Sequence, residues 1–384
     1  MKSYIHRSIT SAFESAFWSG KILILYGPRQ VGKTTFVRSF LEKYPKWRYF
    51  QCEQSQVREI LASCDLPRIM MMLGDADFII FDEAQIVENI GRALKILHDA
   101  YPNIQIIATG SSSFDLQSRV IEPLTGRHRD FMLFPFLYSE LSLHFGAQMI
   151  EKYSLEERIL YGSYPEALSP SAWETPRDAI ARIASDYTLK DVLTFSGIQK
   201  SDTLMKLLKV LAYQIGQEVS YASIAKDFSI SIQTIENYVD ILEKAFIIFR
   251  LSPYADNKRK SIKKMRKIYF WDTGVRNALI NNFESLELRP DKWALFENFY
   301  IAEKYKNILT NNTHENIAFY RAYTGEEIDL IVEKDGKITG YDMKWKSEKK
   351  VLTLSANAPI REISIISREN FSQYLTAWWD EWKL

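Results

Sequence analysis

The pattern of apolar and polar positions in the first third of the chain alternates between buried strands and helices. Apolar runs at Lys21–Tyr26, Phe78–Phe81 and Ile104–Ala108 each end in glycine or polar residues, as strands buried on both faces of a sheet do. Segments with helical spacing lie between them, at Thr35–Tyr44 and Ile90–Tyr101. This alternation predicts an α/β domain with a parallel sheet over residues 1–140.

The middle of the chain has a different pattern. Residues 141–200 are polar and helical, with turn signals at Gly162-Ser163 and Ser169-Pro170, and we expect a helical lid there. Residues 201–270 then predict three helices and a strand, in the order of a winged helix-turn-helix. The expected bounds are 203–216, 221–228 and 231–244 for the helices and 246–251 for the strand.

The last part of the chain, residues 271–384, predicts a separate α/β module. A helix from about Trp293 leads into three strands, and Asp335-Gly336 is the expected hairpin turn between the last two. The strands are expected at 317–320, 327–332 and 339–344. A chain of 384 residues has room for several such domains.

Composition narrows the class of protein only slightly. The 49 lysines and arginines nearly balance 48 acidic residues, so attraction to nucleic acid would need local patches. Cys52 and Cys64 have no metal-ligand spacing and cannot form a disulfide framework. No apolar run approaches the roughly 20 residues of a membrane helix. We therefore expect a soluble, cytoplasmic protein without a membrane partner.

The first apolar run is followed by a phosphate-binding pattern. Residues 27–34 match G-x-x-x-x-G-K-[ST] between an expected strand and an expected helix. Glycines there let backbone N–H groups surround a phosphate, while Lys33 supplies positive charge and Thr34 a hydroxyl for Mg²⁺. The predicted ATP-binding residues are Gly27, Pro28, Arg29, Gln30, Val31, Gly32, Lys33, Thr34 and Thr35.

Two carboxylates end the second apolar run, as in a Walker B element. Asp82 is expected to hold Mg²⁺, directly or through water, and Glu83 to polarise the attacking water as general base. A strand entering a loop often ends in such residues. The phosphate loop about 50 residues earlier favours the catalytic interpretation.

Further candidates follow the third run. Ser111 is placed to contact the γ-phosphate or the water, with Thr109 as the second choice, although both residue types are also common turn formers. Arg127, ahead of an apolar strand at Phe131–Phe136, could reach the γ-phosphate of a second copy and so imply self-association. A surface salt bridge is the alternative for this arginine.

Several of these segments carry a family resemblance. The chain resembles bacterial and archaeal AAA-family ATPases with a C-terminal DUF4143 region, through GPRQVGKTT, FDEA, TGSSS, LTGR and the later YGSYPEA. The similarity spans most of the chain. It implies an AAA+ core, a lid, a winged helix and a nuclease-like tail.

The expected winged helix has two possible partners. Gln233, Thr234 and Asn237 could contact DNA, but Glu236 and Asp240 on the same helix disfavour a phosphate-rich surface. Docking of a protein is the alternative. Seven of the ten residues in Lys258–Lys267 are basic; they are either a solvated charge run or a wing that contacts phosphate.

An acidic set in the last module suggests metal chemistry. Asp342 and Lys344 share a strand face, Asp329 lies on the neighbouring strand, and Glu297 on the preceding helix could complete the set. Asp329 and Asp342 could bind Mg²⁺ while Lys344 orients or deprotonates a water beside a phosphate. This resembles the PD-(D/E)XK restriction-endonuclease fold, with Asp342 where glutamate is more frequent. Cleavage and a binding scaffold both remain open.

Together these features predict a Mg²⁺- and ATP-binding AAA+ ATPase. Its nucleotide state would control a winged-helix and nuclease-like module that acts on DNA. The alternative is a non-nucleolytic, ATP-dependent switch or scaffold that binds a protein partner.

Overall fold

The computed structural model describes most of the chain, and its two compact units are described separately below. The first unit comprises residues 1–135 with 244–246, and the second comprises 136–243 and 247–384. The described residues are 4–111, 124–146, 155–170, 172–196, 201–254, 266–322, 326–346, 360 and 362–376.

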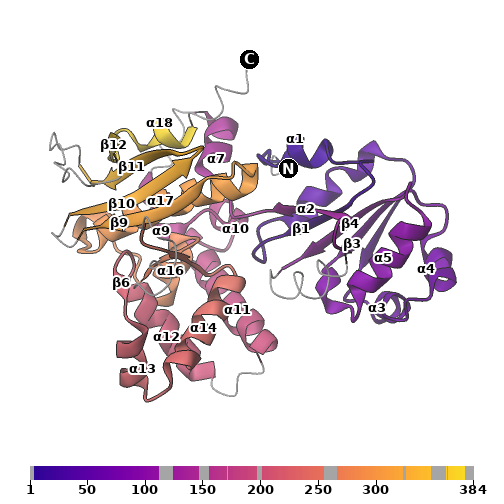
Figure 1. The fold of residues 1–384 in the computed structure, drawn as a ribbon, viewed down its shortest axis with the longest axis horizontal. Helices are drawn as coiled ribbons and strands as arrows, with labels where there is room; N and C mark the ends of the chain where they lie inside the picture. Colours follow the sequence, from indigo (N-terminus) through magenta and orange to yellow (C-terminus); the bar gives the residue numbers. More distant parts are fainter. Residues whose placement is uncertain are drawn as a thin grey trace. The chain divides into compact units, whose positions relative to one another are not determined.

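A five-stranded parallel sheet forms the centre of the first unit (Figure 1). Its strand order is β2-β3-β4-β1-β5. The three predicted strands are confirmed as β1, β3 and β4, which are buried throughout because helices cover both faces. The strand bounds are β1 Ile22–Tyr26, β2 Trp47–Gln51, β3 Phe78–Asp82, β4 Gln105–Gly110 and β5 His128–Met132.

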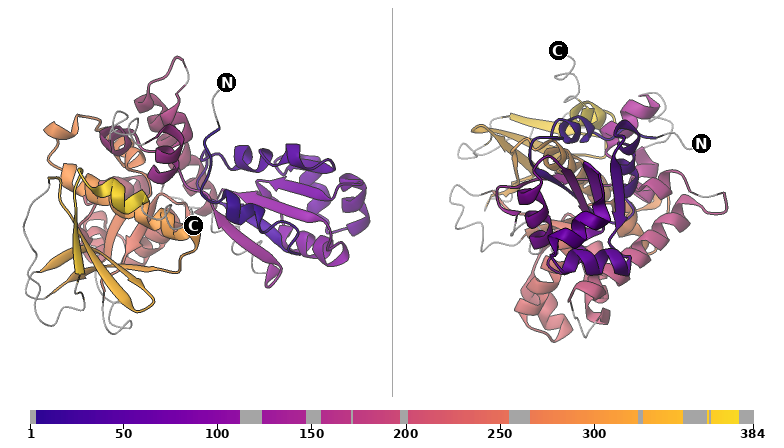
Figure 2. Two further views of the ribbon diagram at one scale, coloured as in Figure 1. Left: turned by 90° about the horizontal axis from the view of Figure 1, so that it is seen from above. Right: turned by 90° about the vertical axis from the view of Figure 1, so that its right-hand side faces the viewer.

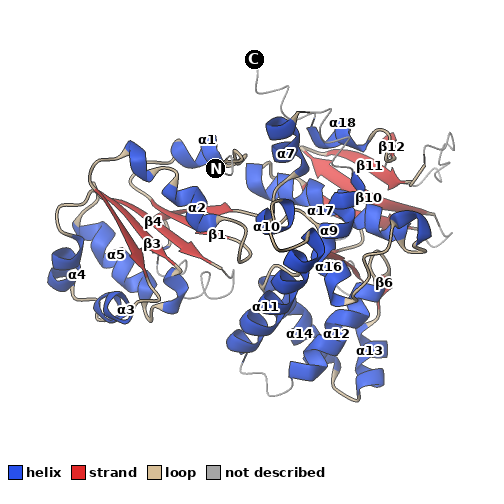
Figure 3. Cartoon of the chain, turned by 180° about the vertical axis from the view of Figure 1, so that it is seen from behind, coloured by secondary structure: helices blue, strands red, loops and turns tan. Residues whose placement is uncertain are grey.

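Helices lie on both faces of this sheet, as Figures 1 and 3 show. One face carries α1 (Thr10–Glu14) and α2 (Lys33–Arg38), and the other carries α3 (Ser55–Ala62), α4 (Leu66–Leu73) and α5 (Ile90–Ala100). Rings from α1, α2 and β5 meet in one cluster, in which Phe13 lies 5.2 Å from Phe36 and 4.8 Å from Phe131 between ring centroids. The expected helix at Thr35–Tyr44 is shorter: α2 ends at Arg38, and a single 3₁₀ turn follows at Leu41–Lys43.

The strand order decides which side chains meet. Strand β4 lies between β1, which leads into the phosphate loop, and β3, which ends in Asp82. All five strands are parallel, and their carboxyl ends therefore lie at one edge of the sheet. The chain from 244 to 246 belongs to this unit as well, and the Phe246 ring lies 6.2 Å from that of Tyr26, the last residue of β1.

The second unit contains a helical part with a small sheet. The three-stranded antiparallel sheet has the order β6-β8-β7, with β8 pairing with both neighbours. Helices α13 and α14 confirm the helices expected over 221–228 and 231–244 within one residue. The bounds are α7 Tyr138–Phe145, α9 Leu155–Tyr161, α10 Pro165–Leu168, α11 Pro176–Ser196, α12 Ser201–Tyr213, β6 Glu218–Val219, α13 Tyr221–Phe228, α14 Ile232–Lys244, β7 Ile248–Leu251, β8 Arg266–Phe270 and α16 Thr273–Leu279.

A four-stranded sheet with two helices follows (Figure 2). Its order is β12-β11-β10-β9, and the rings of Tyr300 on α17 and Tyr374 on α18 both lie 6.2 Å from Tyr341 on β11. The predicted hairpin turn is confirmed, since Asp335 and Gly336 both have positive φ as a type I′ turn requires. The bounds are α17 Lys292–Asn311, β9 Asn316–Arg321, β10 Glu327–Lys334, β11 Lys337–Met343, β12 Glu362–Ile366 and α18 Phe371–Thr376.

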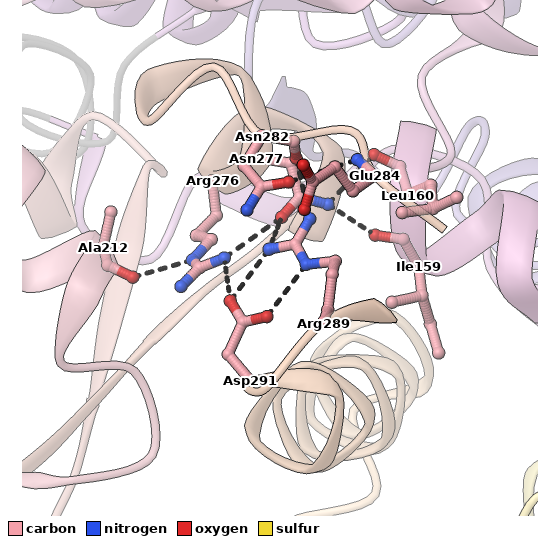
Figure 4. Close-up of polar contacts among 9 residues, drawn as sticks. All are labelled: Ile159, Leu160, Ala212, Arg276, Asn277, Asn282, Glu284, Arg289 and Asp291. Carbon is pink, nitrogen blue, oxygen red and sulfur yellow. Dashed lines mark hydrogen bonds and ion pairs between the residues drawn. The ribbon is translucent and has the colours of Figure 1, made fainter. Parts of the chain in front are cut away.

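A buried polar network joins α12, α16 and the start of α17 (Figure 4). Asp291, at the N-cap of α17, accepts hydrogen bonds from Arg276 at 2.7 Å and from Arg289 at 2.8 Å on each of its oxygens. Each arginine is 1% exposed. Arg276 also donates to the carbonyl of Ala212, and Asn277 donates to the carbonyl of Ile159 in α9. Four helices of this unit are thus connected through the Asp291 carboxylate, two guanidinium groups and the side-chain amide of Asn277.

Within the described ranges, no helix combines the length and the apolar character needed to traverse a lipid bilayer.

Candidate nucleotide site

The loop between β1 and α2 has a backbone conformation that only certain residue types can adopt. Gly27 has φ of 152°, and a Cβ atom there would lie 1.9 Å from the carbonyl oxygen of Leu133. Gly32 and Gln30 also have positive φ, 93° and 61°. Alternating positive and negative φ values turn successive N–H groups inward, which forms the concave anion site called a nest. The predicted residues 27–34 therefore form one continuous bend at the carboxyl end of β1.

Lys33 begins α2 and is turned back over this bend. Its Nζ donates to the carbonyl oxygens of Gly27 at 2.9 Å and Pro28 at 2.7 Å, and the residue is 5% exposed. Arg7 supports the loop by donating to the carbonyl oxygen of Val31 at 3.1 Å. The lysine ammonium is thus held at the mouth of the nest, where it can exchange carbonyl contacts for phosphate oxygens.

Asp82 ends β3 beside this loop. Thr34 Oγ1 donates to Asp82 Oδ2 at 2.8 Å, although 48 residues separate the two in sequence. Thr109 and Tyr49 also donate their hydroxyls to the Asp82 carboxylate. Mg²⁺ prefers carboxylate and hydroxyl oxygens as ligands, and oxygens of both kinds meet at Asp82. The described contacts of Asp82 include no cation that would compete with the metal. Thr34 and Asp82 therefore fit a Mg²⁺ ion held together with substrate phosphates.

Glu83 follows Asp82 in the left-handed region, with φ of 54°, and so ends the extended backbone of β3. Its N–H donates to Thr109 Oγ1 at 3.2 Å. Its Oε2 accepts from Gln85 Nε2 at 2.6 Å, and the same Nε2 donates to Ser111 Oγ at 3.0 Å. Gln85 thus links the expected general base to the end of β4. Its buried Oε1 makes no hydrogen bond within the part of the chain that the structure describes.

Tyr49 and Gln85 were not expected from the sequence. Tyr49 comes from β2, an edge strand without an apolar run, whereas Gln85 stands only two residues after Glu83 and could have been noticed. Burial, together with the bond to Asp82, raises the pKa of Tyr49 to about 12, so its hydroxyl stays a donor at neutral pH. Burial raises the pKa of Cys52 to about 12 as well, which favours the neutral thiol over the thiolate at neutral pH.

The structure places Arg127 away from these residues. It lies just before β5, and its carbonyl accepts from the N–H of Ile22 at the start of β1. Arg127 is therefore at the amino edge of the sheet, opposite to the phosphate loop, and its guanidinium pairs with Asp99 at 2.6 Å. The expected strand at Phe131–Phe136 is also shifted, because pairing with β1 fixes β5 at His128–Met132. Arg127 does not join the site of its own chain, and a contact in trans stays a prediction.

The acidic set of the last module contains a lysine that belongs to the basic run of the sequence. Lys267, counted in the basic run, lies on β8 and is 2% exposed. Its Nζ is 2.6 Å from Glu327 Oε1, 3.3 Å from Glu297 Oε1 and 3.9 Å from Asp329 Oδ1. Burial opposes its charge, but these carboxylates raise the pKa of Lys267 above its usual value, so it remains an ammonium. The expectation that all seven basic residues form an exposed wing is therefore wrong for Lys267, and residues 255–265 lie outside the described residues.

The two predicted metal ligands of this module each face an ammonium group. Asp329 lies near Lys267 and accepts from the N–H of Met343 at 2.9 Å. Asp342 Oδ2 is 2.9 Å from Lys344 Nζ, so these two residues do share a face as the strand pattern predicted. Among the described residues no group of three metal-ligating side chains is arranged to hold an ion. The set Glu297, Asp329, Asp342 and Lys344 comes together, but it does not fit Mg²⁺.

The parallel sheet and the loop after β1 have the AAA-type P-loop ATPase fold. Residues 19–142 match the family described as AAA domain, and residues 293–368 match a domain of unknown function, DUF4143. A second domain of unknown function, DUF8612, matches residues 152–286. The chain thus contains a segment that matches an AAA domain and a C-terminal segment that matches DUF4143, as its motifs predicted.

Similar proteins occur in bacteria and archaea. The chain is 25% identical over 345 residues to an uncharacterized protein of Mycobacterium tuberculosis, covering 89% of this chain and 74% of the relative. It is 26% identical over 336 residues to an uncharacterized protein of Methanocaldococcus jannaschii, covering 83% and 73%. Among solved structures, a Walker-type ATPase of Pyrococcus abyssi aligns with a TM-score of 0.49 and 17% identity over 72% of this chain and 96% of that one.

Proposed function

We propose that this protein is a Mg²⁺-dependent ATPase whose nucleotide site lies at the carboxyl edge of the five-stranded sheet. The observation that carries the proposal is the contact between the start of α2 and the end of β3. Lys33 and Thr34 begin α2, Lys33 lies over the phosphate loop, and Thr34 donates to Asp82, the last residue of β3. The nest from residue 27 to 34 would bind the phosphates, and Lys33 would neutralise the β- and γ-oxygens. When bound, Mg²⁺ would supply charge stabilisation at the phosphates, held by Thr34 and Asp82.

Hydrolysis is assigned to the residues around Glu83. Glu83 would accept a proton from the attacking water, and Gln85 would fix the position of its carboxylate through the 2.6 Å bond. Ser111, joined to the same amide, is proposed to sense the γ-phosphate. Because one amide contacts both residues, a change at Ser111 would alter the orientation of the base.

We also propose that the nucleotide state controls the second unit. Residues 244–246 belong to the first unit, although Lys244 is the last residue of α14. The rest of α14 and the strand β7, which begins at Ile248, belong to the second. Phe246 packs against Tyr26, which directly precedes the phosphate loop. A rearrangement of the loop on nucleotide binding would therefore reach α14 and β7 through a covalent connection. This supports a switch in which ATP binding and hydrolysis favour different conformations.

Replacing Lys33 by alanine tests the nucleotide site. We expect Lys33→Ala to abolish measurable ATP binding, because the ammonium is the cation built into the loop. Equilibrium titration with a fluorescent ATP analogue in MgCl₂ measures this. The matched control is Lys95→Ala, at an exposed lysine of α5 in the same unit, which should bind like wild type. Equal affinity in the Lys33 and Lys95 variants would contradict the site.

DNA binding by the second unit is a further candidate function. The N-terminal half of α14 exposes Gln233 and Asn237, and the acidic Asp240 on this helix is already neutralised by Arg250 at 2.7 Å. Asp240 therefore contributes less negative charge to this helix than the count of its acidic residues suggests. The basic residues from Lys258 to Lys264 follow in the sequence and would supply phosphate contacts.

Salt-dependent binding distinguishes DNA from a protein partner. We expect a duplex oligonucleotide to bind, and a triple change of Lys258, Arg259 and Lys260 to alanine to reduce the slope of log K against log salt by about 3. Fluorescence anisotropy at several salt concentrations measures it. The double variant Lys206→Ala/Lys209→Ala, at exposed lysines of α12, is the control and should keep the wild-type slope. If wild type has no affinity for duplex DNA, docking of a protein is favoured instead.

A further inference from the structure

Lys267 places its positive charge among the carboxylates that a metal ion would need as ligands. Its side chain enters the acidic set from β8, while Glu297 lies on α17 and Glu327 and Asp329 lie on β10. The three carboxylates belong to the same module as the D-x-K pair. The lysine comes from the three-stranded sheet that precedes it in sequence. One ammonium therefore connects two sheets and a helix of the second unit.

The contacts of Lys267 are those of a permanent counter-ion. Its Nζ is within 3.3 Å of both Glu327 and Glu297, and its side chain is 3% exposed. Tyr269, two residues further on β8, points to the same side and donates its hydroxyl to Glu297 Oε1 at 2.5 Å. Gly216 lies against the Glu297 carboxylate, where an added Cβ would be 3.4 Å from both oxygens. Glu297 is thus enclosed by a lysine, a tyrosine and a glycine.

A divalent metal and this lysine exclude one another. Mg²⁺ requires about six oxygen ligands near 2.1 Å in octahedral geometry. Oxygens of Glu297, Glu327 and Asp329 surround an ammonium instead, and Asp342 faces Lys344. Placing a second cation beside Lys267 in a buried site would add strong repulsion.

We propose that Lys267 is the resident cation of this acidic set and stands where a divalent metal would otherwise bind. The set then fastens β8 to α17 and β10 and has no role in metal-dependent cleavage. The DUF4143 module of this protein is accordingly a binding or scaffolding unit. The proposal concerns residues that the ATPase site does not use, so it can fail while the ATPase assignment stands.

Metal binding by the wild-type site is the first test. Asp82→Asn removes the carboxylate of the nucleotide site, and calorimetric titration of this full-length variant with MnCl₂ in the absence of nucleotide reports on the remaining sites. We expect no saturable heat. One equivalent of bound Mn²⁺ that disappears on adding Asp329→Asn would overturn the proposal. Metal-dependent nicking of plasmid DNA that Lys344→Ala abolishes would overturn it as well.

The second test removes the lysine. Lys267→Met keeps the length of the side chain but leaves three carboxylates without their cation, and we expect the melting temperature to fall on the order of 10 °C. In the Asp82→Asn background, where the nucleotide site lacks its carboxylate, MnCl₂ should then raise the melting temperature of the Lys267→Met protein and leave that of the protein with Lys267 unchanged. Lys337→Met, at a 74% exposed lysine of β11, is the control and should melt like wild type.

If Lys267→Met does not fold, a double substitution still tests the proposal. Lys267→Met/Glu327→Gln removes one negative charge together with the positive one, and we expect it to melt above Lys267→Met. A wild-type melting temperature for Lys267→Met would contradict the counter-ion role. Metal-dependent DNA cleavage by wild type that is lost in a folded Lys267→Met protein would make the lysine catalytic and would also contradict the proposal.

Discussion

Replacing Glu83 by glutamine is expected to lower the turnover number of ATP hydrolysis by about 10²–10⁴-fold, the usual contribution of a general base. Glutamine has nearly the same shape but cannot accept the proton of the attacking water. Lys33, Thr34 and Asp82 are untouched, so ATP binding should stay within a few-fold of wild type. The variant should therefore hold ATP without turning it over.

The geometry makes this result specific to Glu83. Its backbone is fixed by the bond to Thr109 and its carboxylate by the bond to Gln85, so the substitution alters the chemical group more than its position. Single-turnover phosphate release measures the chemical step, and titration with an ATP analogue measures binding separately. Glu88→Gln, at an exposed glutamate five residues further on, is the control. Unchanged phosphate release in Glu83→Gln would remove Glu83 from the mechanism.

Replacing Asp291 by asparagine is expected to lower the free energy of unfolding of the second unit by about 3–5 kcal/mol, the usual effect of removing one partner of a buried ion pair. Arg276 and Arg289 are each 1% exposed and would lose their shared anion while remaining buried. Urea denaturation followed by circular dichroism measures the change. Glu287→Gln, at an exposed glutamate four residues earlier, should leave stability within about 0.5 kcal/mol of wild type. A similarly small change for Asp291→Asn would mean that the network does not stabilise the unit.

The Asp291 carboxylate is also expected to make the free energy of unfolding of the second unit depend on pH. Burial opposes ionisation of Asp291, but hydrogen bonds and charge from Arg289 and Arg276 prevail and lower its pKa from 3.8 to about 2. Because the folded-state pKa is depressed, the contribution is fully present above pH of about 4 and is lost as pH falls toward 2. Wild type should lose this increment in that window, and Asp291→Asn should lack it. Equal pH dependence in both proteins would contradict the assignment.

The nucleotide site could be predicted from the sequence because its signals are local. The bend from residue 27 to 34 needs glycines at fixed spacing, and the carboxylates at 82 and 83 directly follow an apolar strand. Tyr49 could not be found in this way. It lies on an edge strand whose residues are exposed or half-buried, so the strand has no apolar run to mark it. Only its pairing with β3 brings its hydroxyl to Asp82.

Charged residues were the least predictable from sequence. Lys267 stands in a run of basic residues and looks like part of a solvated surface. The pairing of β8 with β6 and β7 instead places its side chain within a buried acidic set. For Arg127, the sequence left a contact in trans and a surface salt bridge open. The parallel pairing of β5 with β1 places it at the amino edge beside Asp99. In both cases the partner lies 28 or more residues away along the chain.

By itself, the sequence determined the alternation of strands and helices, the phosphate-binding bend and the pair of acids that serves it, because these depend on side-chain periodicity and backbone conformation over a few residues. The tertiary structure decided the strand order that places β4 between the two halves of the site, and it decided which lysine faces which carboxylate. The reason is that burial and ion pairing depend on the register of elements far apart in the chain, which no local pattern records.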